Sequence, residues 1–453
     1  MFNTHFLTEF SGQKTLAVIV MVALLACLDI VGRRKGRKTH FAFGVVIGSV
    51  LSAGLIRMGN ALLTSGLQQN GYVLGLGIVL LAAVWSMLFG RWQAHTKATV
   101  LGTFLFWILL HMLSKESPDA RLAHMIAIGV AAIPAGLWCA IFLPYHQERL
   151  SVVLTLFFAG AMSTVPILFY DALVRRGATL DFFLFRIETQ SFGSSAHSFV
   201  GNLWPGMAPV GVSVVSTMVM FLLVGFIEEG SKIWVLLKSG KQYISSIDDM
   251  MQMAIVVGIG FAFAENITPT GYFVNFVKQY LMGPGGRDWM AFVGNVTGRS
   301  VLTSMVHIVS TGTAGYFLGL ATFASPLLKE DEQAGRTHPL LRALHRVFGT
   351  RESDIFRREM ILIGFVAALV LHGTCNFLVT IPDILPGNPH TLGDLLKSPA
   401  GSPMHLFSLL LVPTLLYVVG GFILLTTLFN RKTNAKERGH VVEIETLTLA
   451  EEE

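Results

Sequence analysis

The stretch APVGVSVVSTMVMFLLVGFIEEGSKIWVLL, residues 208 to 237, decides the class of fold. The twenty residues from 208 to 227 contain no charged side chain, and a helix of that length crosses a bilayer core of roughly 30 Å. The remaining residues contain Glu228, Glu229 and Lys232, which are costly to bury in hydrocarbon. We therefore expect a membrane-spanning helix that carries charged groups of its own.

Ten other runs of the chain are also apolar and nearly free of charge. They cover residues 15 to 31, 41 to 64, 72 to 90, 99 to 114, 123 to 143, 150 to 172, 249 to 267, 297 to 324, 360 to 381 and 404 to 429. Hydrophobic residues make up 53% of the 453-residue chain and charged residues only 13%, unlike a soluble domain. The runs are continuous, whereas strands of a membrane barrel alternate apolar and polar residues. The sequence predicts an all-α, polytopic bundle of about eleven transmembrane helices.

The basic residues indicate how this bundle is oriented. The stretch GRRKGRK, residues 32 to 38, follows the first run, and such stretches stay in the cytoplasm. Threading the helices from there puts the N-terminus outside and the C-terminus in the cytoplasm. About 21 of the 33 Lys and Arg residues then lie on the cytoplasmic side and about 9 outside. The net charge of +5 therefore indicates topology and contact with anionic lipid, and not binding of nucleic acid.

The two halves of the chain differ in their connections. Five helices with short loops come first, and six helices with longer loops follow. The basic loop at 325 to 359 is expected to carry a short amphipathic helix at the membrane surface. Pro134 and Pro166 are expected to kink the helices that contain them.

Polar residues inside the apolar runs are the candidates for function. Glu228 and Lys232 are four residues apart on one helical face, and Glu229 lies about 100° round the helix. One carboxylate can pair with the lysine, which leaves the other without a local partner and suits it to general acid or base work. The plainer alternative is a salt bridge that braces helix packing.

The next polar groups lie in GIGFAFAENI, residues 258 to 267, where Glu265 and Asn266 end a helix whose small residues allow close packing. A helix cap or an interface hydrogen bond is the alternative explanation here.

Two histidines lie in the following runs. The first belongs to a polar stripe at spacings of three and four residues, which comprises Arg299, Ser300, Thr303, Ser304, His307, Ser310 and Thr311. The second lies in LHGTCNFLV, residues 371 to 379, where His372 and Asn376 are one turn apart. For each histidine taken alone, a role in helix packing and a role in catalysis are equally good explanations. However, burying three glutamates and two histidines on successive helices costs something like 10 kcal/mol, which packing does not explain.

This series of motifs resembles that of the PrsW family of intramembrane proteases. The matching elements are EExxK at Glu228, FxxxEN at Phe261, the helix histidine His307 and HGxxN at His372, in the same order and at similar spacing. That family is similar to the CAAX prenyl endopeptidases and to bacteriocin-processing membrane enzymes. The resemblance covers about residues 150 to 429, which we expect to form the protease core. It leaves 1 to 149 as a five-helix region of unknown role and 430 to 453 as a cytoplasmic tail.

The resemblance implies hydrolysis of peptide bonds within or beside the membrane. Its best-known members cleave an anti-sigma factor in a stress-signalling cascade, so we expect a membrane-protein or peptide substrate and a multi-pass protein of the bacterial inner or plasma membrane. The expected catalytic residues are Glu228, Glu229, Glu265, His307 and His372. The expected supporting residues are Lys232, Asn266, Asn376 and Ser304. The sequence does not indicate an oligomeric state.

The sequence leaves open which group activates the attacking water. Glutamate alone can activate it. The set His307, His372 and Glu265 can instead hold a catalytic Zn²⁺ with a free position for water. No HExxH motif is present, and the metal-free chemistry has a slight preference. Serine chemistry is disfavoured because there is no GxSxG elbow, with Ser304 as the one serine candidate.

Two alternatives come from other classes of protein. A proton-coupled secondary transporter also buries Glu, His and Lys near mid-membrane, but it predicts internal symmetry, and the two halves share no obvious pattern. A non-catalytic membrane scaffold would use the same groups for helix contacts and would have no need to retain both Glu228 and Glu265.

Overall fold

The computed structural model describes residues 39–64, 71–145, 148–182, 185–268, 271–333 and 335–431. The longer helices are α3 (Thr39–Thr64), α4 (Gly71–Leu88), α5 (Ala94–Ser114), α6 (Pro118–Phe142), α7 (Leu150–Met162), α8 (Val165–Arg175), α9 (Phe192–Leu203), α10 (Pro209–Gly240), α11 (Ile247–Ile267), α13 (Trp289–Thr322), α14 (Ala324–Gln333), α15 (Pro339–Phe348) and α16 (Glu352–Ile384). The short ones are α12 (Tyr272–Phe276), α17 (Leu392–Leu395) and α18 (Leu411–Thr414). Two strands, β1 (Thr179–Phe182) and β2 (Phe185–Glu188), pair antiparallel.

Within these described ranges, nine helical segments are long and apolar enough to cross a membrane. They are Phe41–Asn60, Ala94–Ser114, Pro118–Tyr145, Leu150–Arg175, Pro209–Tyr243, Ile247–Leu281, Trp289–Thr322, Glu352–Ile384 and Leu411–Arg431. The chain is therefore an all-α, multi-pass membrane protein, as predicted. The predicted run at 15 to 31 and nearly all of the predicted tail lie outside the described residues. The described apolar part of α4, Gly75–Leu88, is shorter than a full span.

Helix α11 is the central element of the bundle. Its N-terminus is fixed by a capping box, in which the Ser246 hydroxyl accepts from the Asp249 backbone N–H and the Asp249 carboxylate accepts from the backbone N–H of Ser246. Glycine then lets two helices approach closely. A Cβ at Gly258 would stand 2.7 Å from the His307 carbonyl oxygen of α13, and one at Gly260 would stand 2.1 Å from the Phe157 carbonyl oxygen of α7. The predicted close packing of this segment thus positions the helix that carries His307.

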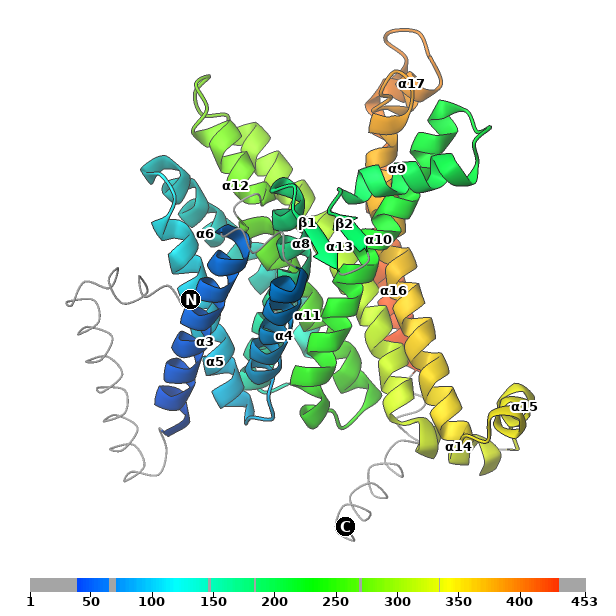
Figure 1. Cartoon of the computed structure of the whole chain (residues 1–453). Helices are drawn as coiled ribbons and strands as arrows, with labels where there is room; N and C mark the ends of the chain where they lie inside the picture. The colour runs from blue at the N-terminus through cyan, green and yellow to red at the C-terminus, as the bar shows by residue number, and fades with distance from the viewer. Residues whose placement is uncertain are drawn as a thin grey trace, which may run out of the picture.

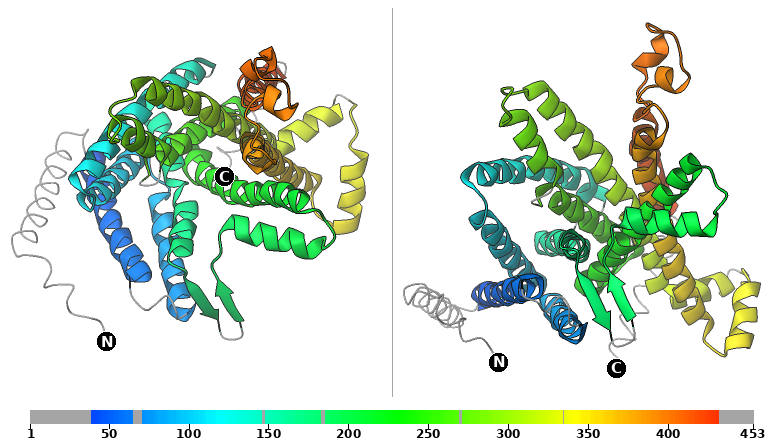
Figure 2. Two further views of the ribbon diagram at one scale, coloured as in Figure 1. Left: turned by 90° about the horizontal axis from the view of Figure 1, so that it is seen from above. Right: turned by 45° about the horizontal axis from the view of Figure 1, so that its top comes forward.

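The other helices surround α11 (Figure 1). Helices α3, α5 and α6 lie on one side of it, and α13 and α16 lie on the other. The predicted kink at Pro166 coincides with the break between α7 and α8, whereas Pro134 lies inside the continuous helix α6. The view from above in Figure 2 shows α14 and α15 at the rim of the bundle, away from its centre.

Candidate active site

Glu229 is the most completely buried acidic group of α10, and its carboxylate has four partners. Its Oε1 lies 2.7 Å from Lys232 Nζ, so Glu229 is the carboxylate that pairs with the lysine. The hydroxyls of Ser310 and Thr311 on α13 donate to its two oxygens at 3.0 and 3.1 Å. His372 Nδ1 on α16 lies 2.7 Å from Oε1. We call Glu229, Lys232 and His372 the inner end of the site, because each is almost fully buried.

The partner of His372 determines which of its ring nitrogens is free. A carboxylate paired with a lysine is an acceptor, so Nδ1 of His372 carries the proton and donates to Glu229. In the neutral imidazole Nε2 then presents a lone pair, and it faces Glu228 Oε2 at 3.4 Å. This oxygen is buried and has no hydrogen-bond partner among the described residues. Two acceptor atoms face each other in a dry site, an arrangement that calls for a proton, a water or a cation between them.

His307 on α13 is held from both sides. Lys232 can only donate, so His307 Nδ1 accepts from Lys232 Nζ at 2.9 Å. The other nitrogen, Nε2, then carries the proton and donates to Glu265 Oε2 at 3.0 Å. Phe261 packs beneath this chain of contacts, with Lys232 Nζ 3.9 Å from its ring centroid. The phenylalanine of the FxxxEN motif thus supports the lysine.

Glu265 connects the site to a more exposed region. Its Oε1 accepts from Arg299 Nη2 at 2.8 Å, and the guanidinium lies over the Tyr272 ring, 3.3 Å from the centroid. The side chains of Glu265 and Arg299 are 29% and 21% exposed, whereas that of Glu229 is fully buried. We call Glu265, Arg299 and His307 the outer end of the site.

Three predicted supporting residues lie nearby without joining this network. Asn266 is buried at the end of α11, and its Oδ1 has no hydrogen-bond partner in the described part of the chain. Ser304 is buried one turn before His307, and Asn376 is half-buried one turn after His372. For the residues that the structure describes, no hydrogen bond links any of the three to Glu228, Glu229 or Glu265.

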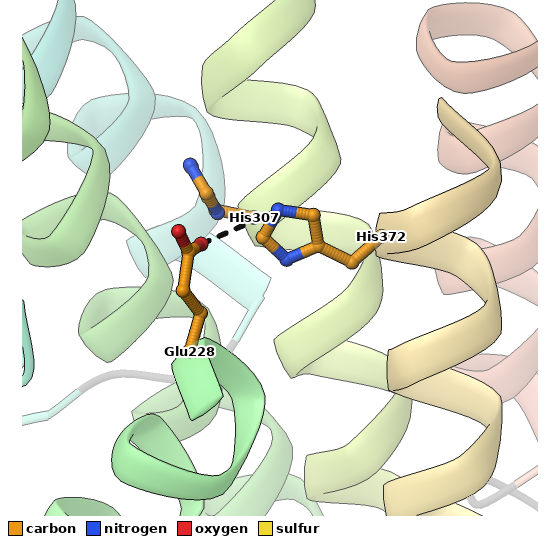
Figure 3. A group of neighbouring side chains, drawn as sticks. All are labelled: Glu228, His307 and His372. Atoms are coloured by element: carbon orange, nitrogen blue, oxygen red, sulfur yellow. Dashed lines mark ion pairs between the residues drawn. The ribbon is translucent and has the colours of Figure 1, made fainter. Parts of the chain in front are cut away.

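The two histidines and Glu228 form a group that fits a metal ion (Figure 3). One ligand atom from each of Glu228, His307 and His372 lies within 4.8 Å of the other two. Two imidazoles and a carboxylate are a known ligand set for catalytic Zn²⁺. Glu228 Oε2 and His372 Nε2 already present free lone pairs, and Glu229 orients His372 as an outer carboxylate does in zinc sites. Both ring nitrogens of His307 are engaged, so it would have to give up its hydrogen bond to Glu265 or to Lys232 and carry its proton on the other nitrogen in order to bind a metal.

This group differs from the ligand set expected from the sequence in one member. Glu265 was expected beside the two histidines. It contacts His307 and Arg299, while the group of ligand atoms that includes both histidines contains Glu228. Sequence reasoning also gave no role to Tyr272, and it named Arg299, Ser310 and Thr311 only as parts of a polar stripe. These three members of the stripe contact the carboxylates of the site.

A multi-pass helical bundle with this buried Glu, His and His group has the architecture of a membrane-embedded peptidase. The family model described as PrsW family intramembrane metalloprotease matches residues 148–392, more than half of the chain, and the chain belongs to that family. The resemblance seen in the motifs is thereby confirmed, and the protein is a membrane-embedded peptidase. The comparisons with curated proteins and with solved structures each found no match.

Proposed function

We propose that the chain cleaves peptide bonds of membrane-associated protein substrates at a centre formed by Glu228, His307 and His372, and that this centre holds Zn²⁺. The observation that carries the proposal is the buried Glu228 Oε2, which lacks a hydrogen bond and faces the lone pair of His372 Nε2 at 3.4 Å. The family membership favours a metal-dependent peptidase over the transporter and scaffold alternatives.

A bound Zn²⁺ supplies Lewis acidity, which polarises a scissile carbonyl and makes a water molecule more acidic. Glu228, His307 and His372 would hold it. Glu229 keeps the proton of His372 on Nδ1, and Lys232 balances the charge of Glu229 within the dry inner end. These two residues position the ligand and do not touch the substrate.

Glu265 is the general base in this proposal. It is the most exposed carboxylate of the site, and its Oε2 lies 3.0 Å from His307 Nε2, so it borders both the metal group and the route for water. Arg299 holds the other oxygen and keeps the carboxylate aimed at His307. The carboxylate would take a proton from the attacking water and return it to the leaving amine. In this proposal Asn376, one turn from His372, donates to the oxyanion.

Peptidase activity within the membrane suits single-span membrane proteins whose cleavage releases a soluble part. The best-known members of the family that the motifs resemble release a signalling protein in this way under stress. We extend that role to this chain as part of the proposal. The multi-pass location follows from the nine apolar spans of the described residues, and the bacterial plasma membrane is the proposed compartment.

The test is to find the cleavage products without choosing a substrate first. Proteoliposomes with the purified chain are mixed with membrane proteins extracted from the source cells, and new protein N-termini are labelled and sequenced. We expect new termini within or beside apolar segments with the wild type and not with Glu228→Gln or His372→Ala.

Asp383→Asn is the matched control, because this exposed carboxylate lies on the same helix as His372. It should give the wild-type set of termini. Termini that persist in both site variants at normal protein abundance would show that the proposed centre is not the active site.

A further inference from the structure

Helix α15 separates its apolar and basic residues onto two faces. At 100° per residue, its apolar side chains fall within an arc of about 120°. They are Leu340, Leu341, Leu344, Val347 and Phe348. Arg342 and Arg346 fall on the opposite side, and His345 borders the apolar arc next to Leu341. The ten residues thus form the amphipathic helix that the sequence predicted for this loop, and its surroundings show what it contacts.

The protein covers only part of the apolar face. Leu341 is buried, and α15 packs against α16. Leu340, Val347 and Phe348 are 64, 75 and 67% exposed. Three large apolar side chains side by side on one short helix are therefore without cover in the described structure, which marks an interaction surface.

The helix axis runs across the bundle. Figure 1 shows α15 nearly end-on, and the view from above in Figure 2 shows it lengthwise, so it lies parallel to the plane of the membrane that the spans cross. The structure fixes this direction. Asp331 of α14 binds Arg336 at 3.1 Å and His338 at 3.0 Å just before the helix. Gly349, with φ of 65°, ends it in the left-handed conformation that glycine tolerates.

The position along the chain places α15 at the level of the membrane surface. It lies between the span that ends at Thr322 and the span that begins at Glu352. Residues 336 to 351 contain four arginines and no acidic residue. The neighbouring acidic residues lie on α14 and at the start of α16, and Asp331 is already engaged by Arg336 and His338.

We propose that α15 lies in the interface of one leaflet and binds anionic phospholipid, with Leu340, Val347 and Phe348 among the acyl chains and Arg342 and Arg346 at the phosphates. Charge complementarity selects this partner, because exposed apolar residues beside arginines that form no ion pair within the described residues fit the boundary between acyl chains and anionic headgroups. The leaflet is the one that the sequence predicts to be cytoplasmic. The inference goes beyond the peptidase activity and does not depend on it.

The test uses the full chain in vesicles. Val347→Cys, in a background without Cys27, Cys139 and Cys375, carries an environment-sensitive dye, and Thr337→Cys is the matched control in the polar connection before the helix. Vesicles contain phosphatidylcholine alone or with phosphatidylglycerol. We expect nitroxide-labelled lipids to quench the dye at 347, and aqueous iodide to quench the dye at 337.

The dependence of α15 insertion on anionic lipid distinguishes this surface from a purely apolar contact. Anionic lipid should raise the ratio of inserted to free α15, and the double variant Arg342→Gln and Arg346→Gln should lower that ratio by about fivefold for each arginine. Equal iodide quenching at both positions in anionic vesicles would overturn the proposal. So would protection of position 347 that increases with the protein-to-lipid ratio, because a second copy would then be the occupant.

Discussion

The inner and outer ends of the site use the same pair of residue types in opposite surroundings. At the inner end, Glu229 binds His372 and is fully buried with four partners. At the outer end, Glu265 binds His307, is 29% exposed, and has Arg299 as its charge partner. A saturated, dry carboxylate can hold a ligand in place but cannot take up a proton easily, whereas an exposed one can exchange protons with water. The difference in burial and partners supports the proposed roles, in which Glu229 holds a ligand in place and Glu265 transfers protons.

The largest expected effect is on the inner end. Glu229→Leu removes the carboxylate that the buried Lys232 ammonium binds directly, and breaking a buried pair in this way costs about 3–5 kcal/mol. We expect loss of folded protein, measured as membrane abundance and thermal unfolding in detergent. The double variant Glu229→Leu and Lys232→Leu should regain much of the stability but none of the activity. Equal instability of the single and double variants would show that the ion pair is not what Glu229 contributes.

Metal content tests which carboxylate belongs to the ligand group. A chelator should abolish cleavage and Zn²⁺ should restore it. Mass spectrometry of the purified chain should find the metal in the wild type and in Glu265→Gln, and not in Glu228→Gln or His372→Ala, because Glu228 is the carboxylate grouped with the histidines. Retention of metal by Glu228→Gln and its loss from Glu265→Gln would restore the ligand set expected from the sequence. Chelator-resistant cleavage by a metal-free preparation would favour glutamate-activated water.

At the outer end, Glu265→Gln should change the rate and not the metal. Removing the general base is expected to lower kcat by about 10²- to 10⁴-fold with little change in KM. The isosteric amide keeps the shape of the side chain but has one acceptor for the two donors Arg299 and His307, so we expect unfolding slightly below the wild-type temperature. Normal turnover by this variant would move the base to another group.

The smallest expected effect concerns Arg299. Arg299→Gln removes the charge that holds Glu265 Oε1, and we expect a loss of about tenfold in kcat with normal metal content. Arg299→Lys keeps the charge but loses the planar contact with Tyr272, so it should rescue only part of the rate. A positioning role also predicts that both variants shift the pH profile of kcat. An unchanged profile in both would assign Arg299 to packing alone.

The sequence could predict the spans and the four helices of the site, because hydrocarbon tolerates few charged residues and each exception marks a position of interest. It could not assign the partners. Positions i+3 and i+4 share a helical face, so the EExxK pattern alone does not tell whether Glu228 or Glu229 binds Lys232. The choice depends on Ser310, Thr311 and His372, which come from two other helices. The ligand group likewise depends on helix rotation, which brings Glu228 rather than Glu265 beside both histidines.

The contact between α11 and α13 also restricts how a substrate can enter. The two backbones meet at Gly258, and Gly315 and Gly319 of α13 are as close to α11, where a Cβ would stand 2.5 and 2.7 Å from its neighbours Ala254 and Ile247. An extended peptide needs about 5 Å beside a neighbouring backbone, so it cannot pass between these helices unless they separate along their length. The seam between α11 and α13 is therefore closed to an extended peptide, and in the proposed function a substrate segment would approach from the side of Glu265, the most exposed carboxylate of the site.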